Sequence, residues 1–280
     1  MKKLACLSFS TLLSVFFATT WAKEQPLKHE VESFEREKLQ AETGDRLAQY
    51  FLGLKYFVGA GVAKDHEQSF SWFQKSANQG FEGAQYEVGV CYQYGYGVSK
   101  DEAAAIIWYR KAAQQGDVVA FCKLGECSFS GIGVAQDYDQ AIYWFRRAAE
   151  LGNATAQRKL GDCYSKGLGV TRSEFVAQTW YYRSFAYFRK MEESAGSGPG
   201  LAATRYMIGM HFEEGLGVPV NLVEAYAYYQ IANANDKRAS LALVRLNNVL
   251  SKDQLAAAQK RTSEILKVIT PKTSLPNGDK

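Results

Sequence analysis

Apolar residues recur along most of the chain at the spacing of helix faces. Ala84, Val88 and Tyr92 follow one another every four residues, which places them on one face of a helix. Ala105, Trp108 and Ala112 share one face of a second helix that follows it. The pattern therefore predicts two amphipathic helices in succession, joined by a short glycine-containing segment.

This helix pair recurs with a constant step of 36 residues over four copies, and a fifth copy follows after 12 extra residues. Repeats of 20–50 residues are typical of solenoids, in which each copy packs on its neighbours. We therefore predict an all-α fold, a right-handed α/α superhelical solenoid of about five helix-turn-helix repeats with helical caps. The markers that keep the step are the pairs Gly59/Gly61, Gly95/Gly97, Gly131/Gly133 and Gly167/Gly169, and Trp72, Trp108, Trp144 and Trp180.

Polar residues mark where the second helix of each pair begins. Each has a side-chain oxygen that can accept a hydrogen bond from a free backbone N–H at a helix start. We therefore interpret them as helix N-caps and not as catalytic acids. They are Asp65, Asp101, Asp137, Ser173 and Asn221.

One glycine of each copy lies inside the first predicted helix, where it costs roughly 1 kcal/mol relative to alanine. Five such losses of helix stability indicate that the second helix approaches these positions too closely for a Cβ atom. We therefore expect contact between the helix backbones. The recurring Trp and Tyr side chains would then fill the seams between repeats. The five positions are Gly53, Gly89, Gly125, Gly161 and Gly209.

These motifs resemble the Sel1-like repeat family, an α/α solenoid related to tetratricopeptide repeats, in its exported bacterial type. The family pattern is matched almost fully by residues 84–116, and the fourth repeat departs from it most, beyond Trp180. The resemblance implies a non-enzymatic scaffold that binds other proteins. It covers residues 44–236, divided as 44–79, 80–115, 116–151, 152–199 with the 12-residue insertion, and 200–236.

The flanking segments are expected to be a targeting signal at the N-terminus and capping helices at both ends of the repeats. Lys2 and Lys3, an apolar run of roughly 15 residues and the small residues around Ala22 are typical of a secretory signal peptide over residues 1–22. The run is shorter than the about 20 residues that a membrane span needs. We therefore expect a periplasmic or secreted protein. Residues 23–43 are predicted as an N-terminal capping helix, 237–270 as C-terminal capping helices and 271–280 as a flexible tail.

Composition narrows the class of partner. With 47% hydrophobic and 22% charged residues the chain is ordinary globular protein rather than intrinsically disordered. Its formal net charge is +4, of which Lys2 and Lys3 lie in the predicted signal peptide, so nucleic acid binding is not indicated. We expect a protein or peptide partner, no membrane insertion after signal cleavage, and a monomer; self-association through the end caps is an alternative.

Cysteines offer the main candidate chemistry. Cys91, Cys127 and Cys163 occupy one place in successive repeats, and Cys122 precedes Cys127 by about one turn. A disulfide or metal site is one interpretation, and buried thiols are the other. Neighbouring helices lie about 8–10 Å apart, whereas a disulfide needs Cα atoms within about 7 Å. We therefore expect buried thiols, with no metal and no cofactor.

No catalytic residue is predicted. The chain contains no Ser-x-x-Lys, Gly-x-Ser-x-Gly or His-Glu-x-x-His motif, and its three histidines share no spacing. Cysteine-rich members of the family pair two cysteines where this chain has Ala113 and Phe121. A cell-wall or β-lactam-acting hydrolase of that cysteine-rich type is the alternative to a scaffold.

A partner is expected in a groove along the first helix of each repeat, because the inner helices of an α-solenoid line a concave surface. Whether an N-terminal helix covers its first residues, Phe51 and Leu54, is left open. The resemblance allows roles in envelope signalling, in host interaction or as an immunity protein against a secreted phospholipase effector. The groove residues opposite the buried side are Phe51, Leu54, Val58, Glu87, Val90, Tyr94, Lys123, Glu126, Lys159, Asp162, Lys166, Met207 and Met210.

Overall fold

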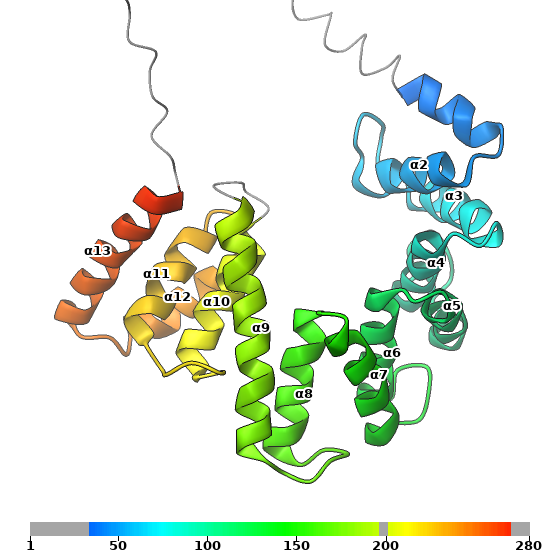
Figure 1. The fold of residues 1–280 in the computed structure, drawn as a ribbon. Coiled ribbons are helices and arrows are strands. Elements are labelled where there is room, and N and C mark those ends of the chain that lie inside the picture. Colours follow the sequence, from blue (N-terminus) through cyan, green and yellow to red (C-terminus); the bar gives the residue numbers. More distant parts are fainter. Residues whose placement is uncertain (1–33, 196–200, 270–280) are drawn as a thin grey trace, which may run out of the picture. The chain divides into compact units, whose positions relative to one another are not determined.

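The structure, a computed structural model, describes residues 34–195 and 201–269. The predicted signal peptide and C-terminal tail lie outside these residues. Within the described residues the only regular element is the helix (Figure 1), beginning with one over residues 34–42. The others are α2 (Arg46–Val58), α3 (His66–Asn78), α4 (Glu82–Tyr94), α5 (Glu102–Gln114), α6 (Val118–Ser130), α7 (Tyr138–Glu150), α8 (Ala154–Lys166), α9 (Glu174–Ala195), α10 (Ala202–Glu214), α11 (Leu222–Ala232), α12 (Lys237–Asn247) and α13 (Lys252–Ile269).

Consecutive helices pack in pairs, and the predicted all-α solenoid class is confirmed. The first helices of the five pairs are α2, α4, α6, α8 and α10, and each is followed by its partner. Helices α3 and α7 also pack on the first helix of the next pair. The chain divides into two compact units, residues 1–120 and 121–280, with the division inside α6.

The predicted N-caps are confirmed. Asp65, Asp101, Asp137 and Asn221 each accept a hydrogen bond from the backbone N–H three residues later, at 2.9–3.1 Å, and Ser173 accepts a longer one of 3.4 Å. These bonds satisfy N–H groups that a helix start leaves without partners. The predicted caps are therefore structural, as their spacing indicated.

The glycines inside the first helices are positions of close approach, but the neighbour is an aromatic ring. A Cβ atom on Gly89 would lie 2.6 Å from two ring carbons of Tyr109, well inside van der Waals contact. The expected contact between helix backbones is therefore wrong for Gly89, since a flat ring from α5 fills the space. The rings over Gly53, Gly125, Gly161 and Gly209 are those of Phe73, Phe145, Tyr181 and Tyr229, each directly after the Trp or Tyr marker.

In three of the turns, the second glycine lies against the backbone of the preceding repeat. Gly97 has a left-handed φ of 69°, and a Cβ atom there would collide with the carbonyl of His66, at the start of α3 in the preceding repeat. Gly169 is similarly close to the backbone of Tyr138, and Gly217 to that of Tyr182. Only glycine fits these places, because both the conformation and the space exclude a side chain.

A recurrent glutamine ties repeats together. Gln49, Gln85 and Gln157 are buried and donate to the carbonyl oxygen eight residues earlier, at the end of the preceding helix, over 2.9–3.4 Å. Arg205 stands at this place in the fifth repeat and instead meets the buried carboxylate of Glu192 at 3.4 Å. A buried ion pair thus replaces the glutamine bond.

The extra residues of the fourth repeat lengthen its second helix. α9 has 22 residues, against 13 in α3, α5 and α7, and Glu192 lies in its last turns. Arg189 and the hydroxyl of Tyr228 also bond to Glu192, at 2.8 and 3.2 Å. The added turns therefore bring a carboxylate to Arg205 and Tyr228, and do not form a separate element among the described residues.

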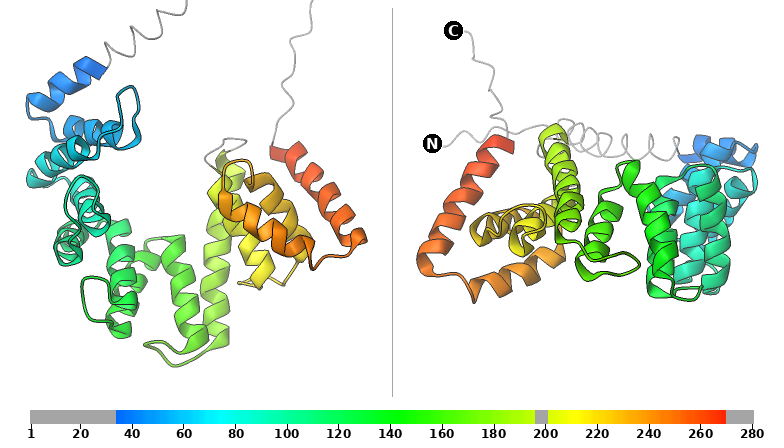
Figure 2. Two further views of the ribbon diagram at one scale, coloured as in Figure 1. Left: turned by 180° about the vertical axis from the view of Figure 1, so that it is seen from behind. Right: turned by 60° about the horizontal axis from the view of Figure 1, so that its bottom comes forward.

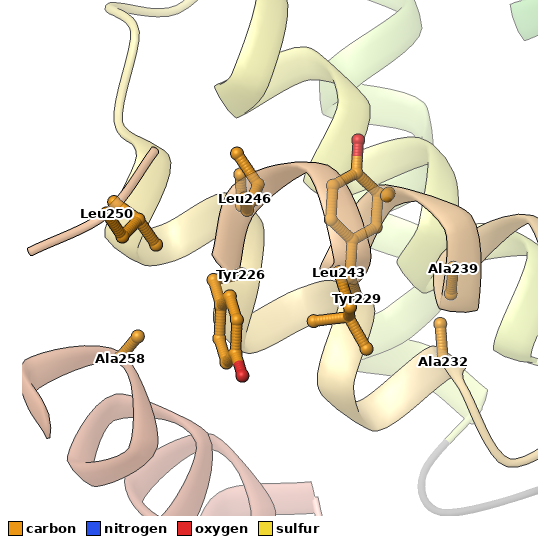
Figure 3. Packing of buried hydrophobic residues seen from close by; sticks show 10 residues of the cluster. Tyr226, Tyr229, Ala232, Ala239, Leu243, Leu246, Leu250 and Ala258 are labelled. Atoms are coloured by element: carbon orange, nitrogen blue, oxygen red, sulfur yellow. The ribbon is translucent and has the colours of Figure 1, made fainter. Parts of the chain in front are cut away.

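Helices also close the two ends of the described chain. The helix over residues 34–42 packs Phe34 and Ala41 against Leu52 and Trp72. At the other end α12 and α13 both pack on α11, as Figures 1 and 2 show. The residues gathered there include Tyr226, Leu243, Leu246 and Ala258, which Figure 3 shows at the meeting of these helices.

Candidate functional site

The predicted groove residues of residues 1–120 form one partly apolar surface, which we call the unit-1 face. Phe51, Val58 and Tyr94 have 54%, 65% and 51% of their surface exposed. Leu54 and Val90 are half-buried beside them. Leu47, not predicted, adds a side chain that is 47% exposed. The unit-1 face comprises Leu47, Phe51, Leu54 and Val58 of α2 and Glu87, Val90 and Tyr94 of α4.

Aromatic contacts hold α2 and α4 together at both ends of this face. The rings of Tyr50 and Phe81 lie 5.0 Å apart between centroids, and those of Phe57 and Tyr96 lie 5.4 Å apart. Both are edge-to-face pairs, a favourable arrangement of aromatic side chains. Tyr94 in turn stacks on Tyr96 at 5.6 Å. The exposed side chains of the two helices are therefore carried by a packed framework.

A hollow of about 690 Å³ lies beside α2, lined by Leu47, Phe51, Leu54 and Val58 and by side chains of the helix over residues 34–42. The described part of that helix leaves Phe51 54% exposed, and Leu54 is half-buried. The first part of the predicted capping helix, residues 23–33, lies outside the described residues, so its cover over this face stays a prediction to be tested. Glu37 of the described part forms an ion pair with Lys55 at the flank of α2. Within the described residues, no segment covers the apolar side chains that line the hollow.

Glu87 gives the unit-1 face an unusual acidic group. Its carboxylate is half-buried, and within residues 34–120 no side chain forms an ion pair or hydrogen bond with it. Burial, and secondarily the negative charge of Asp117, raise the pKa of Glu87 to about 7. Burial and the same two carboxylates raise the pKa of Tyr50. The carboxylate is thus poorly solvated, and no cation within residues 34–120 is paired with it.

Three of the predicted groove residues within 121–280, which we call the unit-2 face, are paired with other side chains of the chain. Lys123 and Glu126 form an ion pair at 2.7 Å. Asp162 is bound by Arg158 at 2.9 Å and accepts a hydrogen bond from Tyr181. The unit-2 face comprises Lys123, Glu126, Lys159, Asp162, Lys166, Met207 and Met210.

The remaining residues of the unit-2 face differ in how much surface they offer. Lys159 lies over the ring of Phe129, with its Nζ atom 5.9 Å from the ring centroid, and Lys166 is exposed at the end of α8. Met207 and Met210 are half-buried and pack against buried hydrophobic clusters. The unit-2 face is therefore more polar than the unit-1 face, and more of its charged side chains are paired within the chain.

The four described cysteines are buried thiols outside any disulfide. Burial is the main cause that raises the thiol pKa, to about 12 for Cys91 and Cys122 and about 11 for Cys163. A thiol with such a pKa is almost wholly protonated at neutral pH and is a poor nucleophile or metal ligand. In the described residues no group of three or more His, Cys, Asp or Glu side chains is arranged to hold a metal ion.

The nearest approach to a catalytic pair is Ser184 and His211, which sequence analysis did not single out together. The Oγ atom of Ser184 lies 3.4 Å from Nε2 of His211, and Nδ1 of His211 lies 2.7 Å from the carbonyl oxygen of Leu216. Both side chains have no exposed surface, and burial lowers the pKa of His211 to about 4. No substrate can reach this pair in the folded protein, so its role is structural.

The protein is an α-helical repeat solenoid. This class is defined by its recurring antiparallel helix pairs, in which an aromatic ring covers a glycine of the first helix and the first helices have an exposed face. A family model described as Sel1 repeat matches residues 46–81, 83–117, 120–153, 154–189 and 202–236. The chain therefore belongs to the Sel1 repeat family, with five repeats.

Solved structures agree with this family. A Sel1 repeat protein from Oxalobacter formigenes is 27% identical over 86% of this chain and 99% of its own, with a TM-score of 0.60. A protective antigen of uropathogenic Escherichia coli strains that displays an SLR fold is 29% identical over 83% of this chain, with a TM-score of 0.53. This chain spans 56% of the length of that antigen. A search of curated proteins found no match.

None of the helices in residues 34–195 and 201–269 is both long and apolar enough to span a membrane.

Proposed function

We propose that this protein is an exported, non-enzymatic scaffold that binds a protein or peptide partner through the first helices of its repeats. Sel1 repeat proteins generally mediate protein–protein interaction. The observation that carries the proposal is the unit-1 face, where Phe51, Val58 and Tyr94 stay more than half exposed and the first two of them line a hollow. Clustered exposed apolar side chains mark interaction sites on soluble proteins.

Export is part of the proposal and rests on the sequence of residues 1–22. Mass spectrometry of the protein recovered from fractionated cells tests it. A mature chain that begins at Lys23 in the periplasmic or secreted fraction is expected. An uncleaved chain that begins at Met1 in the cytoplasmic fraction would contradict export without bearing on the unit-1 face.

Three roles fit such a scaffold: envelope signalling, host interaction, and immunity against a secreted phospholipase effector. Host interaction has one supporting observation, the 29% identity to a protective antigen of uropathogenic Escherichia coli. The other two follow only from the family. A lipase effector encoded beside this protein would favour the immunity role.

Photo-crosslinking in the living cell tests the partner surface directly. A photoreactive amino acid is placed at Phe51 or Tyr94, and at Ile107 as a control, because Ile107 is 57% exposed but lies on α5, the second helix of its repeat. Specific adducts from Phe51 and Tyr94 and none from Ile107 are expected. Equal adducts from all three positions, or adducts from Ile107 alone, would refute binding through the first helices.

Charge-introducing variants extend the test to the unit-2 face. Tyr94→Glu and Lys159→Glu should together abolish recovery of the crosslinked partner and leave the thermal unfolding midpoint unchanged, because neither side chain is part of a buried cluster. Retained binding by this folded double variant would exclude both faces as the contact.

The absence of catalysis is also open to experiment. Turnover of a chromogenic β-lactam is measured with the purified protein and with Ser184→Ala. No turnover above background is expected, because Ser184 and His211 have no exposed surface. Turnover that disappears in the variant would establish the hydrolase alternative.

A further inference from the structure

We propose that the unit-1 face binds an apolar protein segment that carries a lysine or arginine, whose cation is held by Glu87 and Asp117. This inference rests on the proposed function and goes further by giving the chemistry of the partner. It combines two features of one surface: an apolar strip that the described residues leave uncovered, and the carboxylate of Glu87, which forms no ion pair or hydrogen bond within residues 34–120.

The apolar part of the segment has a place to bind. The hollow of about 690 Å³ beside α2 has a volume in the range of pockets that enclose ligand groups. Phe51 and Leu54 form its floor, and Val58 lies at one end. Val90 and Tyr94 continue the apolar strip onto α4, so a bound segment can contact both helices.

Glu87 differs from the other acidic residues predicted for the groove, Glu126 and Asp162. Glu37, Glu126 and Asp162 also lie on or beside the two faces, and each is paired with a cation of the chain, namely Lys55, Lys123 and Arg158. Glu126 and Asp162 find their cations on their own helix, three or four residues earlier. The corresponding positions before Glu87 are Ala84 and Gly83, which carry no charge.

Charge complementarity therefore selects a basic segment over a neutral or acidic one. Asp117 caps α6 by accepting the backbone N–H of Ala120 at 2.7 Å, and its charge also acts on Glu87. Burial, and secondarily this charge, raise the pKa of Glu87 to about 7, and both carboxylates also act on Tyr50 of α2. A cation from a partner would stabilise the ionised form of Glu87, whereas an apolar or acidic segment would leave it desolvated. A basic segment should accordingly bind more tightly at pH 8 than at pH 6.

A library of random 16-residue peptides displayed on phage is the probe, selected on the purified protein at pH 8. Enriched peptides are expected to combine apolar residues with at least one Lys or Arg. Synthetic copies of the best peptides are then titrated by calorimetry. Glu87→Gln should weaken peptide binding about tenfold or more, and replacing the basic residue of the peptide by Gln should have the same effect. Combining the two changes should lower the affinity little further.

Glu82→Gln is the matched control, because Glu82 lies on the same helix but outside the unit-1 face, and it should leave affinity unchanged. Phe51→Glu reports on the face itself. Peptides that Phe51→Glu does not affect would refute the proposed function of this face. Peptides that lose binding to Phe51→Glu, but show no basic preference and bind Glu87→Gln equally well, would overturn this inference alone.

Discussion

Replacement of Gly89 by alanine separates two opposite expectations for a glycine inside a helix. In an open position the change stabilises a helix by about 1 kcal/mol, because alanine has the higher helix propensity. Here the new Cβ atom would lie 2.6 Å from the ring of Tyr109, which has no exposed surface. The Tyr109 hydroxyl donates to Gln93 at 2.7 Å, so the ring cannot slide away without losing that bond. Overpacking of this kind costs about 1–3 kcal/mol.

We therefore expect Gly89→Ala to lower the free energy of unfolding by up to about 2 kcal/mol once the propensity gain of about 1 kcal/mol is subtracted from the cost of overpacking. Urea unfolding followed by circular dichroism measures it. Gly83→Ala in the first turn of the same helix is the control, because its nearest neighbour is the half-exposed ring of Phe81 at 3.1 Å, which can move. That variant should be unchanged or slightly more stable.

A double-mutant cycle shows whether the ring is the cause. In a Tyr109→Leu background the space beside Gly89 is larger, so Gly89→Ala should become neutral or stabilising. The reasoning fails if Gly89→Ala stabilises the otherwise unchanged protein by about 1 kcal/mol, since the glycine would then have no packing role.

Three further predictions concern buried ionisable groups. Burial lowers the pKa of His211 from 6.5 to about 4, so between these pH values the unfolded chain binds more protons than the folded one. The free energy of unfolding should therefore fall by about 3 kcal/mol as pH decreases from 6.5 to 4. Urea titrations at several pH values should show a smaller loss in His211→Gln. The pKa of Glu87 is raised from 4.5 to about 7, so the free energy of unfolding should fall as pH rises through this range, by on the order of 1 kcal/mol given the partial exposure of the side chain. Glu87→Gln should abolish this fall in the same titrations. An equal pH dependence of the unfolding free energy in the variant and the unchanged protein would contradict the prediction. An aromatic disulfide reagent at pH 8 should label none of the buried thiols of the native protein and all of them in denaturant, and rapid native labelling would show that they are accessible: Cys91, Cys122, Cys127 and Cys163.

The sequence predicts the helix pairs and their boundaries well because these depend on local chemistry. An acceptor side chain at Asp101 and a glycine at Gly95 fix where helices begin and end, whatever packs on them. The interior glycines also stand out, since their cost is local and recurs. Which group covers Gly89 is not local. Trp108 and Tyr109 are adjacent in the sequence, and only the rotation of α5 decides that Tyr109 faces the glycine.

The candidate surface is less predictable from sequence. Helix periodicity places Phe51, Glu87 and Asp162 on the side of their helices opposite the buried side. It does not indicate which of the charged side chains are neutralised by a partner. Asp162 receives Arg158 and Tyr181, whereas Glu87 receives no ion pair or hydrogen bond among residues 34–120. Such differences depend on side-chain reach and on what lies opposite in space. For the same reason the hollow beside α2 has no signal in the sequence.

The contact of Gly97 with the start of α3 has a consequence for how the protein melts. In a linear array of repeats, cooperativity depends on the coupling free energy between nearest neighbours as well as on the stability of each copy. Here part of that coupling passes through bare backbone in the turn, at a place that a single methyl group would block. A side chain at this one turn would leave each helix pair intact and yet split one unfolding transition into two.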